Sequence, residues 1–126
     1  MPRDGSLLSP IHVLVVEDEC LIRMMVVEML EDAGFAVSEA PHADAAWAIL
    51  EQRQEDIGVL FTDIDMPGSM DGFVLAGRVA SAWPHIGLIM TSGRRRISDG
   101  EVPDSGLFLS KPYRPADLMQ VIRKTI

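Results

Sequence analysis

The chain has 126 residues, enough for one domain with a buried core, and 48% of them are hydrophobic while 24% are charged. Its formal net charge of -8 argues against a nucleic-acid-binding surface, which requires clustered basic residues. The single cysteine, Cys20, excludes an internal disulfide and a cysteine-based zinc site. We find no apolar stretch suited to a signal peptide or a membrane span, so we expect a cytoplasmic protein that does not associate with membranes.

The N-terminal third contains a tail, a strand and a helix. Residues 1–10 are polar and carry two prolines and a glycine, so we expect a flexible tail before one domain over residues 11–126. Ile11–Val16 is a nearly continuous apolar run, which is typical of a buried central strand. The pattern from Cys20 to Ala33 is helical, and Gly34 ends it.

The two sides of this first helix differ in the sequence. The expected core residues recur at helical spacing: Met25, Val26, Met29, Leu30 and Ala33. Met24 and Val27 lie off this face, and an exposed apolar pair indicates a surface for a partner.

The middle of the chain repeats the alternation of strand and helix. Phe35–Ala40 alternates in polarity, which favours an edge strand, and Ile57–Thr62 is apolar and therefore buried. The helix between them should bury Ala43, Ala46, Trp47 and Leu50. A third helix follows Asp71-Gly72 and ends before Pro84, with an expected buried stripe of Phe73, Ala76, Gly77 and Ala80.

The last part of the chain supplies two more strands. Ile86–Thr91 and the short Leu107–Leu109 are both apolar, and a final helix begins near Pro115. Leu118, Val121 and Ile122 should dock that helix against the sheet. The interval 94–105 contains few apolar residues together with a glycine and a proline, so any helix there is expected to be short or irregular.

Five strands alternating with helices predict an α/β protein with a parallel sheet covered on both faces. Ligands bind such sheets at the carboxyl ends of the strands. Polar residues follow or end four of these strands: Glu17, Asp18, Asp63, Thr91 and Lys111. Converging carboxylates repel one another unless a cation intervenes, and oxygen ligands suit Mg²⁺. A lysine and a hydroxyl opposite them are suited to phosphate oxygens.

In these motifs the chain resembles the receiver domain of two-component response regulators, as found in chemotaxis regulators. The matching residues are Glu17-Asp18, Asp63, Met66-Pro67-Gly68, Asp71-Gly72, Thr91-Ser92 and Lys111-Pro112. The resemblance covers about residues 11 to 126. It implies a flavodoxin-like, doubly wound sheet of five parallel strands in the order 2-1-3-4-5.

The resemblance also implies a metal-dependent phosphoacceptor. Asp63 would accept a phosphoryl group from a histidine kinase or a histidine phosphotransfer protein, in a phosphorelay that requires Mg²⁺. Asp18 would bind the metal directly, Glu17 largely through water, and Asp65 through its backbone carbonyl. Such a domain is not an enzyme with a separate substrate, although it promotes its own phosphorylation and slow dephosphorylation.

The conformational switch is likewise implied by the resemblance. Thr91 would move toward the phosphoryl group, Lys111 would pair with that group, and Phe108 would rotate as the switch aromatic. Lys111-Pro112 is expected to be a cis peptide. Phe108 replaces the tyrosine that is commoner in the family, and Ser69 is an apparent extra residue in its loop.

Recognition of a kinase is expected beside the acceptor, on the first helix and the loop after the fifth strand. Leu21, Ile22 and Met24 would offer apolar contacts, with Pro112 and Tyr113 at the rim. A homodimer is compatible with the resemblance. The chain fits both a stand-alone regulator and the receiver of a longer protein.

Two other classes of function compete with this interpretation. Asp63-Ile-Asp65 is similar to the Asp-x-Asp motif of haloacid-dehalogenase-type phosphatases, and Thr91 and Lys111 follow in the order that those enzymes use. That motif usually opens its domain, whereas two strand–helix units precede it here, and Asp117 is the lone acid after Lys111. A purely structural interaction domain would not explain the converging polar strand ends.

Overall fold

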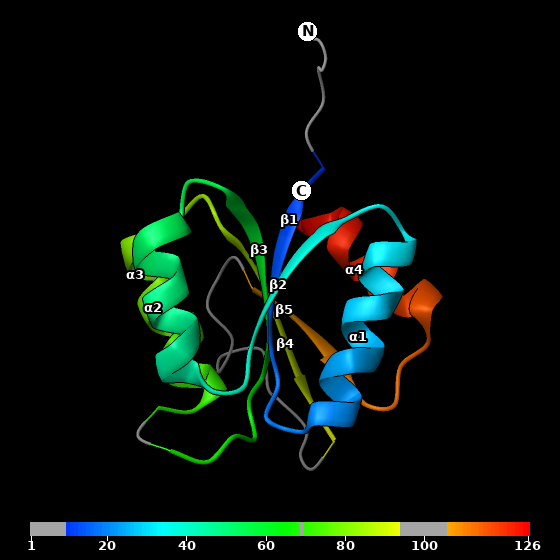
Figure 1. The fold of residues 1–126 in the computed structure, drawn as a ribbon, viewed down its shortest axis with the longest axis horizontal. Coiled ribbons are helices and arrows are strands. Elements are labelled where there is room, and N and C mark those ends of the chain that lie inside the picture. Colours follow the sequence, from blue (N-terminus) through cyan, green and yellow to red (C-terminus); the bar gives the residue numbers. More distant parts are fainter. Residues whose placement is uncertain (1–9, 69, 94–105) are drawn as a thin grey trace, which may run out of the picture.

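The computed structural model describes residues 10–68, 70–93 and 106–126 (Figure 1). Within these ranges the strands are β1 (His12–Val16), β2 (Ala36–Ala40), β3 (Ile57–Asp63), β4 (Gly87–Ser92) and β5 (Gly106–Ser110). The helices are α1 (Cys20–Asp32), α2 (Ala43–Arg53), α3 (Gly72–Ala82) and α4 (Pro115–Thr125). The expected tail, the extra Ser69 and the short helix of the interval 94–105 lie outside the described residues.

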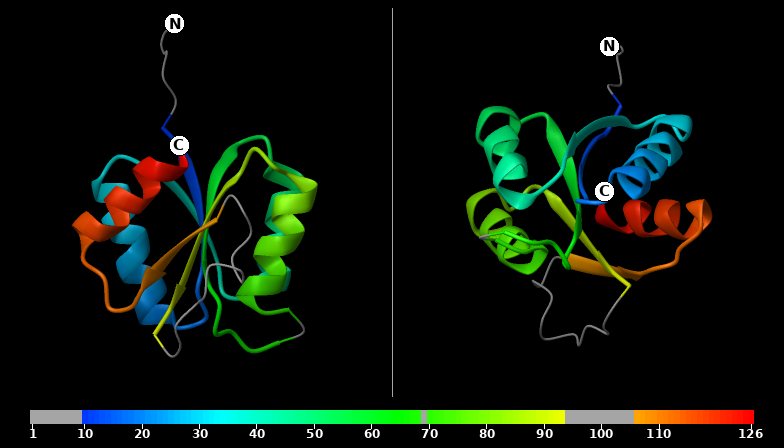
Figure 2. Two further views of the ribbon diagram at one scale, coloured as in Figure 1. Left: turned by 180° about the vertical axis from the view of Figure 1, so that it is seen from behind. Right: turned by 60° about the horizontal axis from the view of Figure 1, so that its bottom comes forward.

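The five strands form one parallel sheet in the order β2-β1-β3-β4-β5, which confirms the predicted fold class and topology. β2 lies at an edge, as its alternating sequence predicted. Helices α2 and α3 cover one face of the sheet, and α1 and α4 cover the other (Figures 1 and 2). The carboxyl ends of the strands therefore meet at one edge, at the bottom of Figure 1.

Helix α1 is rotated from the predicted orientation. Val26 and Leu30 are buried as expected, but Met25 is 58% exposed and Ala33 is also exposed, so those two predictions were wrong. Val27 packs partly against the core, which corrects its placement on the outer side. Ala33 follows the last helical residue, and its position no longer obeys the helical period. Met24 is exposed as predicted.

Helix α3 also differs from the predicted stripe by about one residue. Its buried residues are Gly72, Leu75, Ala76 and Val79, whereas Phe73, Gly77 and Ala80 are only partly buried. Gly72 explains this rotation, because a Cβ atom at that position would clash with the backbone oxygen of Asp63. The start of the helix can approach the end of β3 this closely only with glycine, and this contact fixes which residues face the sheet.

Helices α2 and α4 agree with the sequence pattern. Ala43, Ala46 and Leu50 are fully buried in α2, with Trp47 packed partly against them. In α4, Leu118 and Ile122 are buried and Val121 packs at the margin. None of the helices in the described residues is long and apolar enough to cross a membrane.

Candidate functional site

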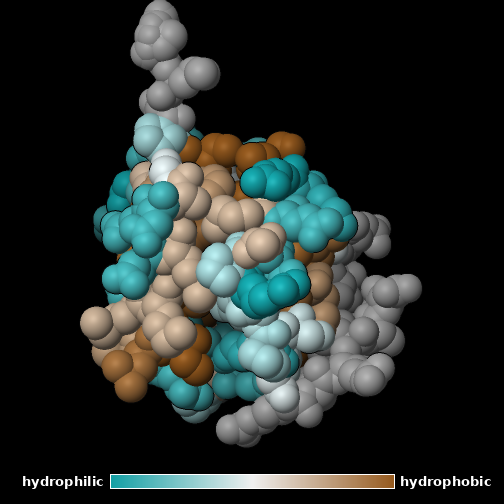
Figure 3. Space-filling view, turned by 90° about the vertical axis from the view of Figure 1, so that its right-hand side faces the viewer, coloured by the Kyte–Doolittle hydropathy of each residue, from teal (hydrophilic) through white to brown (hydrophobic). Residues whose placement is uncertain are grey.

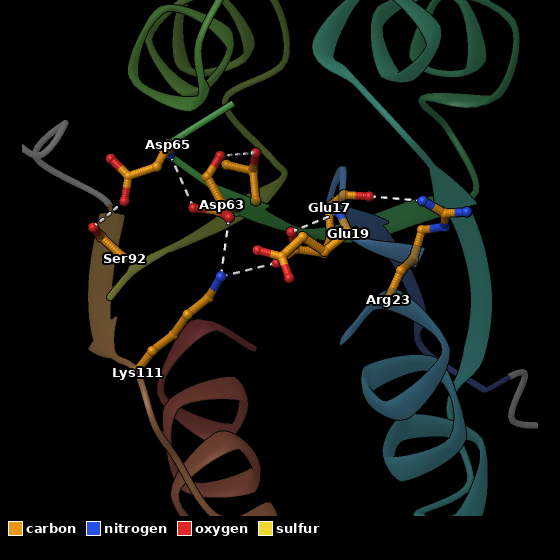
Figure 4. Close-up of polar contacts among 8 residues, drawn as sticks. Glu17, Glu19, Arg23, Asp63, Asp65, Ser92 and Lys111 are labelled. Carbon is orange, nitrogen blue, oxygen red and sulfur yellow. Dashed lines mark hydrogen bonds and ion pairs between the residues drawn. The ribbon is translucent and has the colours of Figure 1, made fainter. Parts of the chain in front are cut away.

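Glu17, Asp63 and Lys111 meet at the carboxyl edge of the sheet (Figure 4). Glu17 follows β1, Asp63 ends β3, and Lys111 follows β5. Backbone hydrogen bonds hold the first and last of these in place: the Glu17 N–H donates to the Ala40 carbonyl at 3.1 Å, and the Lys111 N–H donates to the Ser92 carbonyl at 3.0 Å. Sheet pairing therefore brings together residues that are up to 94 positions apart in the chain.

The Lys111 ammonium bridges two buried carboxylates. Its Nζ atom donates to Glu17 Oε1 at 3.0 Å and to Asp63 Oδ2 at 3.0 Å, while the carboxylate side chains are only 5% and 6% exposed (Figure 4). Burial alone would lower the pKa of Lys111, but the hydrogen bonds with Asp63 and Glu17 raise it above the ordinary value. The lysine is therefore a fixed positive charge beside the expected acceptor.

The surroundings of Glu17 disfavour the ionised form of its carboxyl group. Burial raises its pKa from 4.5 to about 7, and the nearby Asp63 carboxylate acts in the same direction. The hydrogen bonds that Oε1 accepts from Lys111 and that Oε2 accepts from the Glu19 N–H oppose this rise. A bound cation would favour the ionised form of the same group.

Glu17, Asp18 and Asp63 each offer a carboxylate oxygen, and these atoms all lie within 4.8 Å of one another. Such an oxygen set fits a hard divalent cation such as Mg²⁺, which usually keeps several water ligands. A pocket of about 250 Å³ adjoins this acidic group and is lined by Asp18, Glu19, Ile22, Asp63, Asp65, Gly93 and Lys111. The arrangement therefore has both the ligands for a cation and the space for a phosphoryl group.

Asp65 takes part in the site in a way that the sequence did not reveal. Its N–H donates to Asp63 Oδ1 at 2.9 Å, and its carboxylate accepts a hydrogen bond from the Ser92 hydroxyl (Figure 4). The side chain is therefore held by the end of β4. Its backbone carbonyl as a metal ligand stays a prediction.

Thr91 is placed beside the acceptor by the sheet register, which pairs it with Asp63. It is 1% exposed, and its hydroxyl oxygen is buried with no hydrogen-bond partner among the described residues. A buried hydroxyl without a partner is costly. A phosphoryl oxygen at Asp63 would offer such a partner, which is the arrangement that a switch residue requires.

The other two predicted features of this edge lie on and after β5. Phe108 pairs with Met90 and packs, partly buried, against the core on the α2 and α3 side. The Lys111-Pro112 peptide is cis, as expected.

An apolar groove lies next to the acidic site, between α1 and the start of the loop after β5. Its volume is about 410 Å³, and its lining includes Ile22, Met25, Val26, Met29, Pro112 and Tyr113. The Tyr113 ring contacts Phe61 with centroids 5.8 Å apart, and burial raises the pKa of Tyr113 to about 12. Figure 3 faces this side of the molecule and shows hydrophobic surface at its lower left. Leu21 and Met24 are 76% and 58% exposed.

Comparison with known sequences identifies this class of site. A family model described as the response regulator receiver domain matches residues 13–123. The chain belongs to the response regulator receiver family, whose members act in two-component systems. This family assignment favours the receiver interpretation over the phosphatase alternative.

Individual relatives agree with the family. The chain is 32% identical to the response regulator receiver protein CpdR of Brucella abortus, over 91% of this chain and 96% of that protein. It is 31% identical to the transcriptional regulatory protein PdtaR of Mycobacterium tuberculosis, over 98% of this chain but only 60% of that protein. Among solved structures, the chemotaxis protein CheY4 of Vibrio cholerae has a TM-score of 0.81 and 26% identity, covering 94% of this chain and 100% of that one.

Proposed function

We propose that this receiver domain accepts a phosphoryl group on Asp63 in a Mg²⁺-dependent reaction. The observation that carries the proposal is the Lys111 ammonium, which lies 3.0 Å from both Asp63 and Glu17 at the edge of an acidic group. A lysine held against a buried carboxylate can neutralise phosphate oxygens that arrive there. The donor is a phosphohistidine of a kinase or a phosphotransfer protein, or a small molecule such as acetyl phosphate.

The proposed reaction is a displacement at phosphorus. A carboxylate oxygen of Asp63 forms a P–O bond, while the P–N bond of the phosphohistidine, or the P–O bond to acetate, breaks with its electron pair remaining on the leaving group. The Asp65 N–H holds Asp63 Oδ1, and Lys111 holds Oδ2, so the acceptor is oriented before the donor arrives. Bound Mg²⁺ supplies positive charge against the oxygens of the transferring group.

Four residues would hold the metal. Asp18 and Asp63 would contribute carboxylate oxygens directly, Glu17 would act largely through water, and Asp65 would contribute its backbone carbonyl. Asp18 is the exposed member of this acidic group, whereas Glu17 and Asp63 are buried and both pair with Lys111, so Asp18 is the carboxylate of the three that is not neutralised by the lysine.

Phosphorylation would then change the conformation through Thr91, Phe108 and Lys111. The new phosphoryl oxygens accept hydrogen bonds from Lys111 and from the Thr91 hydroxyl, which otherwise stays buried without a partner among the described residues. Movement of Thr91 toward Asp63 leaves space into which Phe108 rotates. A difference of a few kcal/mol between the two states is enough to reverse their populations.

The apolar groove beside the site is the proposed surface for the kinase or the phosphotransfer protein. A helix that carries a phosphohistidine must come close to Asp63 to transfer its group. Ile22, Pro112 and Tyr113 line this groove, and the exposed Leu21 and Met24 on the same helix would extend the contact. In this mode of recognition a helix buries its apolar face in a hydrophobic groove.

Intact mass spectrometry with acetyl phosphate and Mg²⁺ tests the acceptor. We expect a single phosphoryl adduct on the wild-type protein and on an Asp56→Asn control, whose carboxylate is exposed and lies away from the site. Asp63→Asn should carry none. A full adduct on Asp63→Asn would show that the acceptor has been misassigned, and repeated turnover of a generic phosphatase substrate would favour the phosphatase class.

A further inference from the structure

A single arginine of α1 holds the loop that carries the acidic residues. Arg23 Nη1 donates to the backbone carbonyl of Glu17 at 2.8 Å (Figure 4). Arg23 Nε donates to Glu39 Oε1 at 2.9 Å. The arginine side chain is only 16% exposed. One guanidinium thus connects α1, the loop after β1 and the edge strand β2.

With the contact from Arg23 to its carbonyl, every polar group of Glu17 has a hydrogen-bond partner. Its N–H is bonded to Ala40, and its two carboxylate oxygens are bonded to Lys111 and to the Glu19 N–H. Because a peptide group is planar, the direction of the Glu17 carbonyl also fixes the direction in which the chain enters Asp18. Arg23 therefore influences Glu17 and Asp18, although it contacts neither carboxylate.

We infer that Arg23 is a positioning residue of the cation site, acting through the backbone of Glu17. The inference rests on the proposed function, since it concerns the Mg²⁺ that phosphorylation of Asp63 requires. The ion pair with Glu39 is not the essential contact, because that glutamate is 48% exposed and exposed pairs contribute little. The essential contact is the charged hydrogen bond to the carbonyl.

Removal of Arg23 distinguishes positioning from a simple charge effect by the sign of the change. The guanidinium is positive, so electrostatics alone predicts that its loss makes the site more negative and tightens cation binding. Loss of positioning predicts weaker binding, because Glu17 and Asp18 would then lose conformational entropy when the cation brings them together. A purely structural role predicts a lower melting temperature with unchanged affinity.

Calorimetric titration with Mg²⁺ alone measures the affinity directly. In Arg23→Met we expect the dissociation constant to rise about tenfold, the low end for residues that orient metal ligands. In the acetyl phosphate reaction the Mg²⁺ concentration at half-maximal rate should rise in parallel, while the rate at saturating Mg²⁺ stays near that of the wild type.

Two control variants separate the carbonyl contact of Arg23 from its charge and from its ion pair with Glu39. Arg53→Met makes the same change of charge but removes contacts to Ser38 and Asp56, which lie away from the acidic group, so its Mg²⁺ affinity should equal that of the wild type. Glu39→Gln keeps the contact between Arg23 and the Glu17 carbonyl and should also bind Mg²⁺ normally.

Unchanged or tighter Mg²⁺ binding in a folded Arg23→Met variant would overturn the inference while leaving the proposed function intact. If that variant does not fold, Arg23→Gln replaces it, since glutamine keeps a polar end but has no charged donor for the Glu17 carbonyl. Wild-type affinity in Arg23→Gln would equally overturn the inference. A wild-type protein that binds no Mg²⁺ and forms no adduct would overturn the proposed function, and the inference with it.

Discussion

Replacing Glu17 by glutamine should stabilise the protein in the absence of divalent cations. Burial raises the pKa of Glu17 from 4.5 to about 7, so its ionised form is less favourable in the folded state than in the unfolded state. The stabilising contribution of the protonated group is fully present below pH 4.5 and is lost as the pH rises through about 7. Stability of the wild type should therefore decrease across this window.

The size of the effect follows from the same two pKa values. A difference of one pKa unit corresponds to about 1.4 kcal/mol, so above pH 7 the ionised Glu17 costs about 3 kcal/mol relative to its neutral form. Glutamine keeps one acceptor oxygen for Lys111, but its amide nitrogen cannot accept the hydrogen bond from the Glu19 N–H, a loss of about 1 kcal/mol. We therefore expect Glu17→Gln to raise the free energy of unfolding at pH 8 by about 2 kcal/mol.

Urea unfolding at pH 8 and at pH 4.5, with a chelator present, measures this change. The two proteins should converge at the lower pH, and Glu51→Gln, an exposed residue of α2, should match the wild type at both. Saturating Mg²⁺ should stabilise the wild type by about 3 kcal/mol at 100 times its dissociation constant, and Glu17→Gln by less. A Glu17→Gln protein that is less stable than the wild type at pH 8 in chelator would refute the dominance of burial.

Three further variants or conditions test the metal, the partner and the switch. Asp18→Ala should weaken Mg²⁺ binding more than tenfold by calorimetry, since too few protein ligands remain for the ion, and unchanged affinity would remove Asp18 from the ligand set. Met24→Glu should slow phosphoryl transfer from the cognate kinase but not from acetyl phosphate. The control Val74→Glu alters an exposed apolar residue of α3 and should leave both rates unchanged. A wild-type rate of transfer from the kinase in Met24→Glu would place the docking surface elsewhere. Beryllofluoride, a phosphoryl mimic, should change hydrogen-exchange protection over residues 94–110; protection that changes only at residues 17–22 would contradict the switch through Thr91 and Phe108.

The sequence by itself determined the order of the strands and helices and showed that the site residues lie at the carboxyl edge of the sheet. Apolar runs such as Val59–Phe61 and the helical patterns between them are local signals, and they predicted the five strands and the helices α1 and α3 to within about two positions. Asp63, Thr91 and Lys111 could be assigned to one site from sequence, because parallel strands necessarily bring their carboxyl ends together.

Only the tertiary structure decided how α1 and α3 are rotated about their axes and which side chains form hydrogen bonds with one another. The rotation of α3 depends on the close approach of Gly72 to the Asp63 carbonyl, a contact that hydrophobic periodicity does not encode. The bond between Asp65 and Ser92 and the contact of Arg23 with the Glu17 carbonyl join residues from different elements. Their physical cause is the packing of helices against a twisted sheet, which sets distances between groups that no local pattern in the sequence specifies.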